Sequence, residues 1–494
     1  MSRRSIRLAL AAAICAFAMA PAGADVRIIL RDGRVINVPI APEEVQSIEM
    51  RQGRTGAAPG LPPAPSGTNL PPAPGYLPGS KITPENTAPV EPPRSGATFN
   101  APAPVAAEPT TAGKIQVGPT RQIKLPSQAA GLAKPGDIIE IDAGTYRGDV
   151  ASWRADGITI RGVGGRARLV ADGNNAEGKA IWVIKGHDTT VENIEFTGAE
   201  VPDHNGAGIR GEGVNLKIIN CFFHDNEEGI LAGDNPTSVI DIENSEFARN
   251  GGNEGRSHEI YINHIKELIV RGSYFHQGHI GHLIKSRAAT SLIMGNRITD
   301  ENGDSSYQID TSNGGRVFVI GNLLEQDEQS QNSNIVANAM EGATNESQEF
   351  WVVNNTFVND LGHGTFVVSR APGRAHVINN LFIGGGVAFH GTGDLQNNVM
   401  AAGPGGAPNL EKALFDSGDI KEEGTKTASD PGLVDVKNYD WHPKPDSPVI
   451  GAGVDPGSAD GMSLLPTVEY VHPAHGKPVR IKAPIDVGAY QHGG

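Results

Sequence analysis

A short phrase that recurs along the chain constrains its fold more than any other feature. Each copy has an apolar strand, then a small or amide residue, then a large apolar residue. The copies end at Phe196, Phe223, Phe247, Phe275, Ile298, Leu324, Phe357, Phe382 and Met400, with separations of 18 to 33 residues. A wandering period of this size, without helical periodicity, predicts the coils of a parallel β-helix. The repeated amides should form ladders at the turns, because each coil lies about 4.8 Å above the last.

A second series of short strands lies between these phrases. Its middle residues are Ile209, Ile230, Ile260, Ile284, Ile309, Val336, Val367 and Phe389. Because strand side chains alternate between faces, a buried middle residue should direct both neighbours outward. The expected outward column is Arg210, Leu231, Tyr261, Lys285 and Asp310, and one further step adds Glu212, Asn263 and Arg287. We expect Tyr261, Lys285 and Asp310 to occupy consecutive rungs and to face solvent.

The fold class that follows is all-β, a single-stranded right-handed parallel β-helix of about ten coils over residues 114–405. The 63 Gly, 35 Pro and 5% aromatic residues agree with many short strands and turns. A short helix from Pro126 is expected to cap the first coil and to protect its unpaired edge. Residues 406–494 are less regular and are expected to close the last coil.

The first hundred residues predict export rather than catalysis. Arg3, Arg4 and Arg7 precede an apolar run that is too short to span a membrane, so residues 1–24 are interpreted as a signal peptide. Residues 25–55 form a small β module with a hairpin turn at Asp32-Gly33. Residues 56–113 are Pro/Ala-rich and are expected to be a disordered linker. The mature protein is therefore expected to be periplasmic or secreted, with no integral membrane segment.

Charge and cysteine content exclude several classes of partner and site. The net charge of -15 argues against a nucleic-acid partner, and an anionic ligand would require a local basic patch. Removal of the signal peptide leaves Cys221 as the single thiol, which cannot form an internal disulfide or a cysteine zinc site. Its apolar surroundings predict a buried small hydrophobic residue.

Several motifs together suggest a family. Pro135-Gly136-Asp137, the asparagine-ended coils, Ser447-Pro448 and Asp486-Val487-Gly488-Ala489 resemble secreted right-handed parallel β-helix proteins of the pectate-lyase-like superfamily. The resemblance covers roughly residues 115–491. It implies a polysaccharide-active protein and leaves the reaction open, because this scaffold carries lyases, hydrolases, epimerases and non-enzymatic binders.

The segment 255–315 departs most from a plain structural repeat. Its candidate catalytic residues are Lys285, Arg287, Tyr261, His282 and Asp310, and the candidate substrate-binding residues are Arg210, His258, Glu259 and Asn263. β-Elimination on a uronate polysaccharide needs a cation for the sugar carboxylate, a base for the α-proton and an acid for the leaving oxygen. We assign the carboxylate to Arg287 with Arg210, the base to Lys285 or His282, and the acid to Tyr261.

Other interpretations of the same residues stay open at this stage. A glycoside hydrolase would use two carboxylates, here Asp310 and Glu259. A uronate C5-epimerase would use nearly the same groups as a lyase, and a non-catalytic glycan-binding protein would use the face without turnover. Lys285 and Asp310 could also be a plain cross-strand salt pair, and His258 and His282 could be turn residues bonded to the backbone.

Calcium is the one cofactor that a resemblance suggests. Lys285 and Arg287 are similar in type and face to the basic residues of chondroitinase-B-type and alginate lyases, which implies a calcium ion held by acidic side chains. Glu259 has no second acid on its strand, which departs from that pattern. The acidic loop 300–304 could bind calcium instead. Otherwise we expect no cofactor, and an acidic polysaccharide as the partner.

Overall fold

The computed structural model describes residues 26–29, 35–38, 113–252, 255–409 and 418–493. The chain consists of two compact units, residues 1–94 and 95–494. In the first unit, β1 (Val26–Ile29) and β2 (Val35–Val38) pair antiparallel, as a hairpin turn at Asp32-Gly33 predicts. The predicted signal peptide and the predicted linker up to residue 112 lie outside the described residues.

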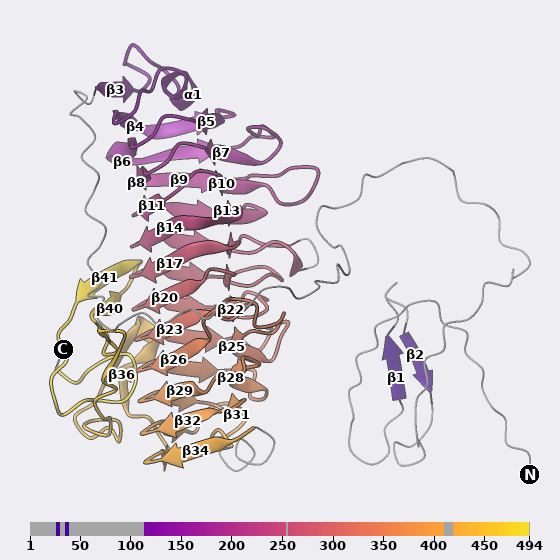
Figure 1. Ribbon diagram of the computed structural model, residues 1–494, viewed down its shortest axis with the longest axis vertical. Helices are drawn as coiled ribbons and strands as arrows, with labels where there is room; N and C mark the ends of the chain where they lie inside the picture. Colours follow the sequence, from indigo (N-terminus) through magenta and orange to yellow (C-terminus); the bar gives the residue numbers. More distant parts are fainter. Residues whose placement is uncertain (1–25, 30–34, 39–112, 253–254, 410–417, 494) are drawn as a thin grey trace, which may run out of the picture. The chain divides into compact units, whose positions relative to one another are not determined.

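The second unit is an all-β, right-handed parallel β-helix of about 12 turns (Figure 1). The predicted fold class is confirmed, with more turns than the ten or so expected. One sheet has ten strands, and we call it the face sheet. The coils at both ends add no strand to it, which accounts for the larger number of turns. Its strands are β5 (Ala151–Trp153), β7 (Ala180–Ile184), β10 (Ala207–Gly211), β13 (Glu228–Ala232), β16 (Ile260–Ile262), β19 (Ile284–Ser286), β22 (Ile309–Thr311), β25 (Asn334–Asn338), β28 (Thr365–Ser369) and β31 (Val387–His390).

The other large sheet has 23 strands and bends at a corner in every coil. We call it the corner sheet. Its strands are β3 (Lys114–Val117), β4 (Ile138–Arg147), β6 (Thr159–Val170), β8 (Thr189–Glu192), β9 (Ile194–Thr197), β11 (Leu216–Ile219), β12 (Phe222–His224), β14 (Asn235–Glu243), β15 (Glu246–Ala248), β17 (Ile265–Arg271), β18 (Tyr274–His276), β20 (Thr290–Met294), β21 (Arg297–Thr299), β23 (Arg316–Ile320), β24 (Leu323–Gln326), β26 (Glu349–Val353), β27 (Thr356–Asn359), β29 (Ala375–Ile378), β30 (Leu381–Ile383), β32 (Gly393–Gln396), β33 (Val399–Ala401), β34 (Ile420–Glu423) and β35 (Lys426–Ala428).

The first coil is covered as the sequence predicts. Helix α1 (Pro126–Ala130) places Ala129, which is fully buried, against the core. Within the described residues, no helix is long and apolar enough to cross a bilayer.

The corner of each coil is made by a residue with a left-handed backbone. Asparagine takes this position at residues 193, 220, 244, 354, 379 and 397, with φ between 49° and 57°, and glycine takes it at 272, 295 and 321. These are the residue types that adopt this conformation at least cost. The amide therefore recurs in the sequence phrase partly because the backbone at the corner is left-handed.

The residue after the corner points inward, and from Ser245 onward it builds the predicted ladder. The amide oxygen of Asn322 accepts the backbone N–H of Asn296 at 3.0 Å, and that of Asn355 accepts the N–H of Asn322 at 2.9 Å. Each side-chain NH₂ donates to a carbonyl of the coil before it, as Asn322 does to Ile293 at 2.8 Å. These asparagines are fully buried, so the ladder satisfies backbone groups that no water reaches.

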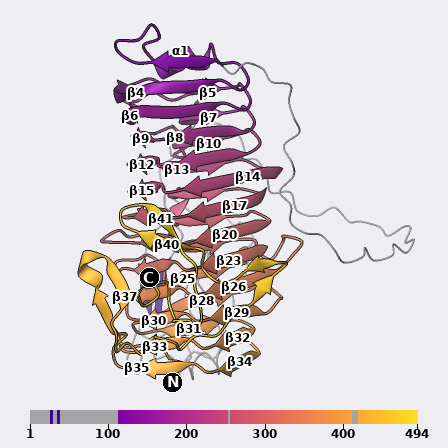
Figure 2. The same cartoon turned by 90° about the vertical axis from the view of Figure 1, so that its left-hand side faces the viewer.

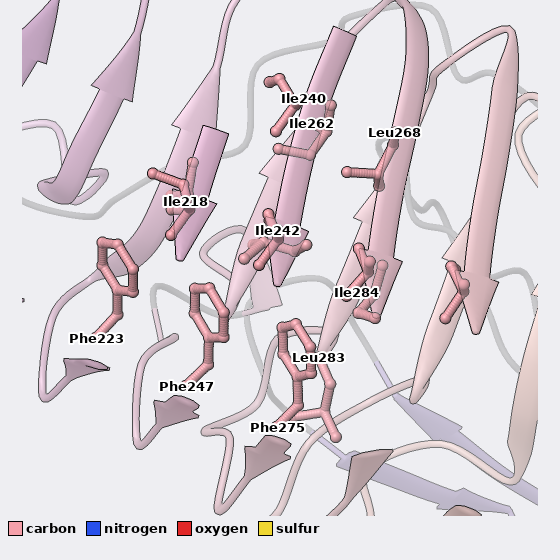
Figure 3. Packing of buried hydrophobic residues seen from close by; sticks show 14 of the residues in the cluster. Ile218, Phe223, Ile240, Ile242, Phe247, Ile262, Leu268, Phe275, Leu283 and Ile284 are labelled. Carbon is pink, nitrogen blue, oxygen red and sulfur yellow. The ribbon is translucent and has the colours of Figure 1, made fainter. Parts of the chain in front are cut away.

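The large apolar residue of each phrase forms the core. Figure 3 shows Phe223, Phe247 and Phe275 stacked from coil to coil, with ring centroids 4.9 and 4.6 Å apart and nearly parallel planes. Cys221 is fully buried beside this stack, and burial raises the pKa of its thiol to about 12. The prediction that Cys221 is a buried small residue is confirmed.

The face sheet corrects one expectation about side-chain direction. The residue after each middle residue points outward as predicted, but the residue before it points inward. Leu283 and Ile284 both enter the core (Figure 3), and Glu259 and Gln308 are fully buried. The strands β16, β19 and β22 begin only at the middle residue, so alternation does not apply to the residue before it. In β25 and β28 the preceding residues, Ile335 and Phe366, enter the core although they lie within the strand.

The C-terminal segment does not simply close the last coil. Strands β34 and β35 pair with β32 and β33 and extend the stack to Ala428, beyond the expected boundary at residue 405. Residues 433–490, which we call the strap, then run back over the corner sheet (Figures 1 and 2). The strap contains β36 (Leu433–Asp435), the 3₁₀ turn η3 (Val436–Asn438), β37 (Asp440–Pro443), β38 (Ser458–Ala459), β39 (Met462–Ser463), β40 (Val468–Val471) and β41 (His475–Pro478).

The strap explains which corners carry asparagine and which carry glycine. A Cβ atom at Gly272 would lie 2.5 Å from the backbone nitrogen of Gly476, so only glycine fits beneath the strap there. At other corners the amide binds the strap. Asn244 accepts the N–H of Gly476 at 2.7 Å, and Asn354 donates to the carbonyl of Asp486 at 2.9 Å.

The ladder makes a stability prediction. Asn322→Ala would leave the N–H of Asn296 buried without a partner, at about 1–3 kcal/mol, and would remove one donor from the carbonyl of Ile293. We expect the free energy of unfolding in urea to fall by that order. Asn322→Ser should lose less, because Ser245 and Ser273 already accept a backbone N–H at this column. Equal losses in the two variants would contradict the ladder's role.

Candidate functional site

The candidate side chains come from adjacent rungs of the face sheet. Tyr261 pairs in register with Lys285, and Lys285 with Asp310. Arg287 follows two residues after Lys285 and therefore lies on the same side of the sheet. The predicted alignment of these residues is confirmed.

The expected exposure is wrong for Lys285 and Asp310, whereas Tyr261 is half-buried. Lys285 is 9% exposed and Asp310 is 2% exposed. The connection between β25 and β26 folds over them, and its backbone is fixed to the sheet because Glu341 donates its N–H to Ser312 O at 3.0 Å. This connection belongs to the longest repeat, the 33 residues between Leu324 and Phe357.

Glu341 in that connection is the main contact of both cations and was missed by sequence reasoning. Lys285 Nζ donates to Glu341 Oε1 at 2.8 Å, and Arg287 Nη2 donates to Oε2 at 2.5 Å. Partial burial alone would raise the pKa of Glu341, but the hydrogen bonds from Lys285 and Arg287 outweigh it and lower the pKa to about 2. The unusual length of this one repeat was the signal that could have found it.

The other N–H groups of the Arg287 side chain donate hydrogen bonds to neutral groups. Its Nε donates to the hydroxyl of Tyr261 at 2.9 Å, and its Nη1 donates to Asn313 Oδ1 at 2.6 Å. The tyrosine hydroxyl is thus fixed beside the guanidinium and keeps its own proton available.

Asp310 lies on the other side of Lys285. Its Oδ2 accepts the hydroxyl of Ser312 at 2.6 Å and lies 3.7 Å from Lys285 Nζ. Its Oδ1 is buried without a hydrogen-bond partner among the described residues. Burial raises the pKa of Asp310 above its ordinary value, against the opposing effects of Lys285 and Ser312.

The two histidines stack at the turns that lead into the sheet. The rings of His258 and His282 are 4.8 Å apart, and His282 stacks on Tyr307 at 4.9 Å. Nδ1 of His258 accepts the N–H of His282, and Nδ1 of His282 accepts the N–H of Tyr307. Burial lowers the pKa of His258 well below its ordinary value and that of His282 to about 3. Both rings are neutral near pH 7, with the proton on Nε2.

The predicted substrate-binding residues do not form one group. Glu259 is fully buried inside the coil, where it accepts the N–H of Asn250 at 3.1 Å, so it cannot contact a substrate as predicted. Arg210 lies three rungs from Lys285 and donates to Asn205 O at 3.1 Å. Asn263 is half-buried, two residues after Tyr261.

Glu228 is a second carboxyl group that sequence reasoning missed. It is 1% exposed, and its Oε2 accepts the N–H of His258 at 3.1 Å. Burial raises its pKa well above the ordinary value, although the charges of Arg210 and Lys285 oppose this. Its position as the first residue of a face-sheet strand, β13, was the signal in the sequence that could have identified it.

The acidic loop 300–304 does not fit a calcium ion. Its carboxylates turn to separate partners within the protein: Asp300 binds Ser305, Ser330 and Gln308, Glu301 binds Arg297 and Tyr274, and Asp304 binds His279. In the described part of the chain, no group of three or more His, Cys, Asp or Glu side chains could hold a metal ion. We therefore derive no chemical step that uses calcium.

An open groove of about 530 Å³ lies over the loops that lead into this part of the sheet. Polar side chains line it, among them Arg249, Gln277, His279, Asp304 and Gln329. It offers hydrogen-bonding groups on the same loops that carry His258 and His282.

Comparisons with known proteins concern the architecture. No protein-family model matches the sequence, and no curated protein matches it. Pectate lyase Pel9A is similar in structure, with 14% identity, a TM-score of 0.44 and coverage of 74% of this chain and 90% of that chain. The A-module of the mannuronan C-5 epimerase AlgE6 from Azotobacter vinelandii has 13% identity, a TM-score of 0.32 and coverage of 61% and 93%. A mutant of the PL6 family alginate lyase AlyGC has 14% identity, a TM-score of 0.26 and coverage of 76% and 59%. These values assign no role to any side chain.

The neutral histidine stack predicts a pH dependence of stability. The pKa of His282 is about 3 in the folded protein and near 6.5 in an unfolded chain. Between these values only the unfolded chain binds the proton, so stability should fall as the pH decreases from 6.5. His282→Gln keeps an acceptor and a donor but does not titrate, so its unfolding midpoint should fall less between pH 6.5 and pH 4. Parallel pH profiles for the two proteins would contradict this assignment.

Proposed function

We propose that the protein is a lyase that cleaves a uronate-containing polysaccharide by β-elimination on the face sheet. One observation carries the proposal. Two largely buried cations, Lys285 and Arg287, converge on a single carboxylate, and a proton-transferring group lies on each neighbouring rung. The coiled architecture that this chain shares with polysaccharide lyases and an epimerase agrees with it.

The chemistry of elimination matches this arrangement. Neutralising the sugar carboxylate makes the proton on the adjacent carbon acidic. A base removes that proton, its electron pair forms a carbon–carbon double bond, and the glycosidic oxygen leaves with a proton from an acid. The reaction needs no water and no oxidant.

The contacts suggest a division of roles among three rungs. Lys285 is an ion-pair partner of two carboxylates, and an ammonium group cannot accept a proton, so we assign it with Arg287 to the sugar carboxylate. His282 carries its proton on Nε2 and has its other nitrogen occupied, which disfavours it as the base. Asp310, with a raised pKa and an unoccupied Oδ1, is the better base, and Tyr261 supplies the acid.

A glycoside hydrolase is the second candidate, for one specific reason. Asp310 and Glu341 both lie within 4 Å of Lys285 Nζ, and their pKa values are displaced in opposite directions. Such a pair is typical of an acid and a nucleophile or base in glycosidases. The pair predicted from sequence, Asp310 and Glu259, is excluded because Glu259 lies inside the coil.

Product analysis separates these functions. The protein should be incubated with pectate, alginate and glycosaminoglycans, and both unsaturated uronate absorbance and new reducing ends should be measured. A lyase gives both signals, and a hydrolase gives reducing ends alone. A uronate epimerase gives neither, but it changes the sugar composition. Binding without any product would favour a non-catalytic role.

Substitution of the two flanking groups tests the roles directly. Tyr261→Phe and Asp310→Asn should each lower kcat by about 10²- to 10⁴-fold, the usual contribution of a positioned acid or base. The folded state should survive, since both changes are nearly isosteric. Arg370→Ala, an exposed change after β28, two rungs from Asp310, is the control and should keep full activity. Activity retained in both Tyr261→Phe and Asp310→Asn would reject the site.

The pH profile provides an independent test of the base. Asp310 must be ionised to accept a proton, and burial raises its pKa. We therefore expect kcat/KM to rise with pH along an acidic limb that lies above the ordinary aspartate range. A profile without that limb would contradict the assignment of Asp310.

A further inference from the structure

In the contact between Glu341 and the two cations, the cations are more deeply buried than the carboxylate. The side chains of Lys285 and Arg287 are 11% and 15% exposed, whereas that of Glu341 is 42% exposed. The cations thus lie beneath the carboxylate that neutralises them. Buried cations are costly without a partner, so this position always requires a negative charge.

Glu341 supplies most of that charge. Among the described residues it is the only carboxylate in an ion pair with Arg287, whose other contacts are the neutral Tyr261 and Asn313. Lys285 has a second partner in Asp310, at the longer distance of 3.7 Å. Each carboxylate oxygen of Glu341 faces one cation, which is the two-point arrangement that a carboxylate ligand would need.

Only the side chain of Glu341 would have to move to free this position. Its backbone N–H is bound to Ser312 O, and Asn345 Nδ2 in the same connection donates to Ala288 O at 3.0 Å and Gly314 O at 2.9 Å. The connection can therefore stay on the sheet while the exposed carboxylate rotates toward solvent.

We propose that Lys285 and Arg287 form a subsite for a sugar carboxylate and that Glu341 occupies it as a displaceable internal carboxylate. This inference rests on the proposed function for the identity of the ligand, a uronate. An incoming uronate replaces one carboxylate with another, so the buried cations stay paired. A neutral sugar offers no such exchange, because it would leave both cations without a counter-charge. Glu341 is therefore a specificity-determining residue that favours acidic over neutral sugars.

The test is a binding measurement that needs no cleavage. Free galacturonate, glucuronate, mannuronate and guluronate, with galactose as the neutral control, should be titrated calorimetrically into the wild type and Glu341→Gln. Removing the internal competitor should tighten binding of at least one uronate by about tenfold or more, with no gain for galactose. Glu346→Gln removes the same charge from an exposed position of the same connection and should bind like the wild type.

Two outcomes would overturn the subsite. One is unchanged uronate affinity in Glu341→Gln, and the other is an equal gain in Glu346→Gln, which would indicate a general charge effect. If Glu341→Gln folds poorly, its refolding yield should rise with the uronates and not with galactose, and a rise with neither would also reject the proposal.

The experiments distinguish failure of the proposed subsite from failure of the proposed lyase activity. A gain in uronate affinity without any unsaturated product from any polysaccharide would leave the subsite standing and reject the lyase. Unsaturated product from the wild type, with no gain in Glu341→Gln, would reject the subsite alone.

Discussion

The structure depends on one bend in each coil, where a left-handed residue is followed by an inward side chain that is polar from Ser245 onward. The bend fixes where the two strands of the corner sheet meet, and the buried amide joins each coil to the next. Because every coil turns at the same point, the strands of the face sheet also stack in register. Tyr261, Lys285 and Asp310 lie one per coil. The register of the coils therefore brings them together, and no single local contact would do so.

Sequence reasoning succeeded where a repeat imposed the answer. The core phenylalanines, the ladder and the pairing of Tyr261 with Lys285 all follow from a period that side chains must obey in every coil. It failed for Glu259, because this residue precedes the first residue of β16 and escapes the alternation rule. It also failed for Glu341, because a connection that folds over a sheet has no counterpart in neighbouring coils and leaves no periodic trace.

The pKa values of the carboxyl groups in the site differ because their surroundings differ. The carboxyl groups of Asp310 and Glu228 are enclosed, and burial raises the pKa of each. Glu341 is the more open group, and its contacts with two cations decide its ionisation. Carboxyl groups of one site thereby ionise differently because of their surroundings, which is what a reaction with separate binding, base and acid functions requires.

The strap has a consequence for how the molecule loses its structure. Stacked coils contact only their neighbours, so an uncovered solenoid can fray from either end one rung at a time. Tyr470 packs on Tyr274, Leu464 packs among residues such as Phe318 and Ile378, and Val487 packs beside Leu381. Coils distant from one another in the stack are thereby tied to a single polypeptide segment, and the half of the solenoid that carries Lys285, Asp310 and Glu341 should open as one cooperative unit, whereas the coils nearest α1 can fray independently.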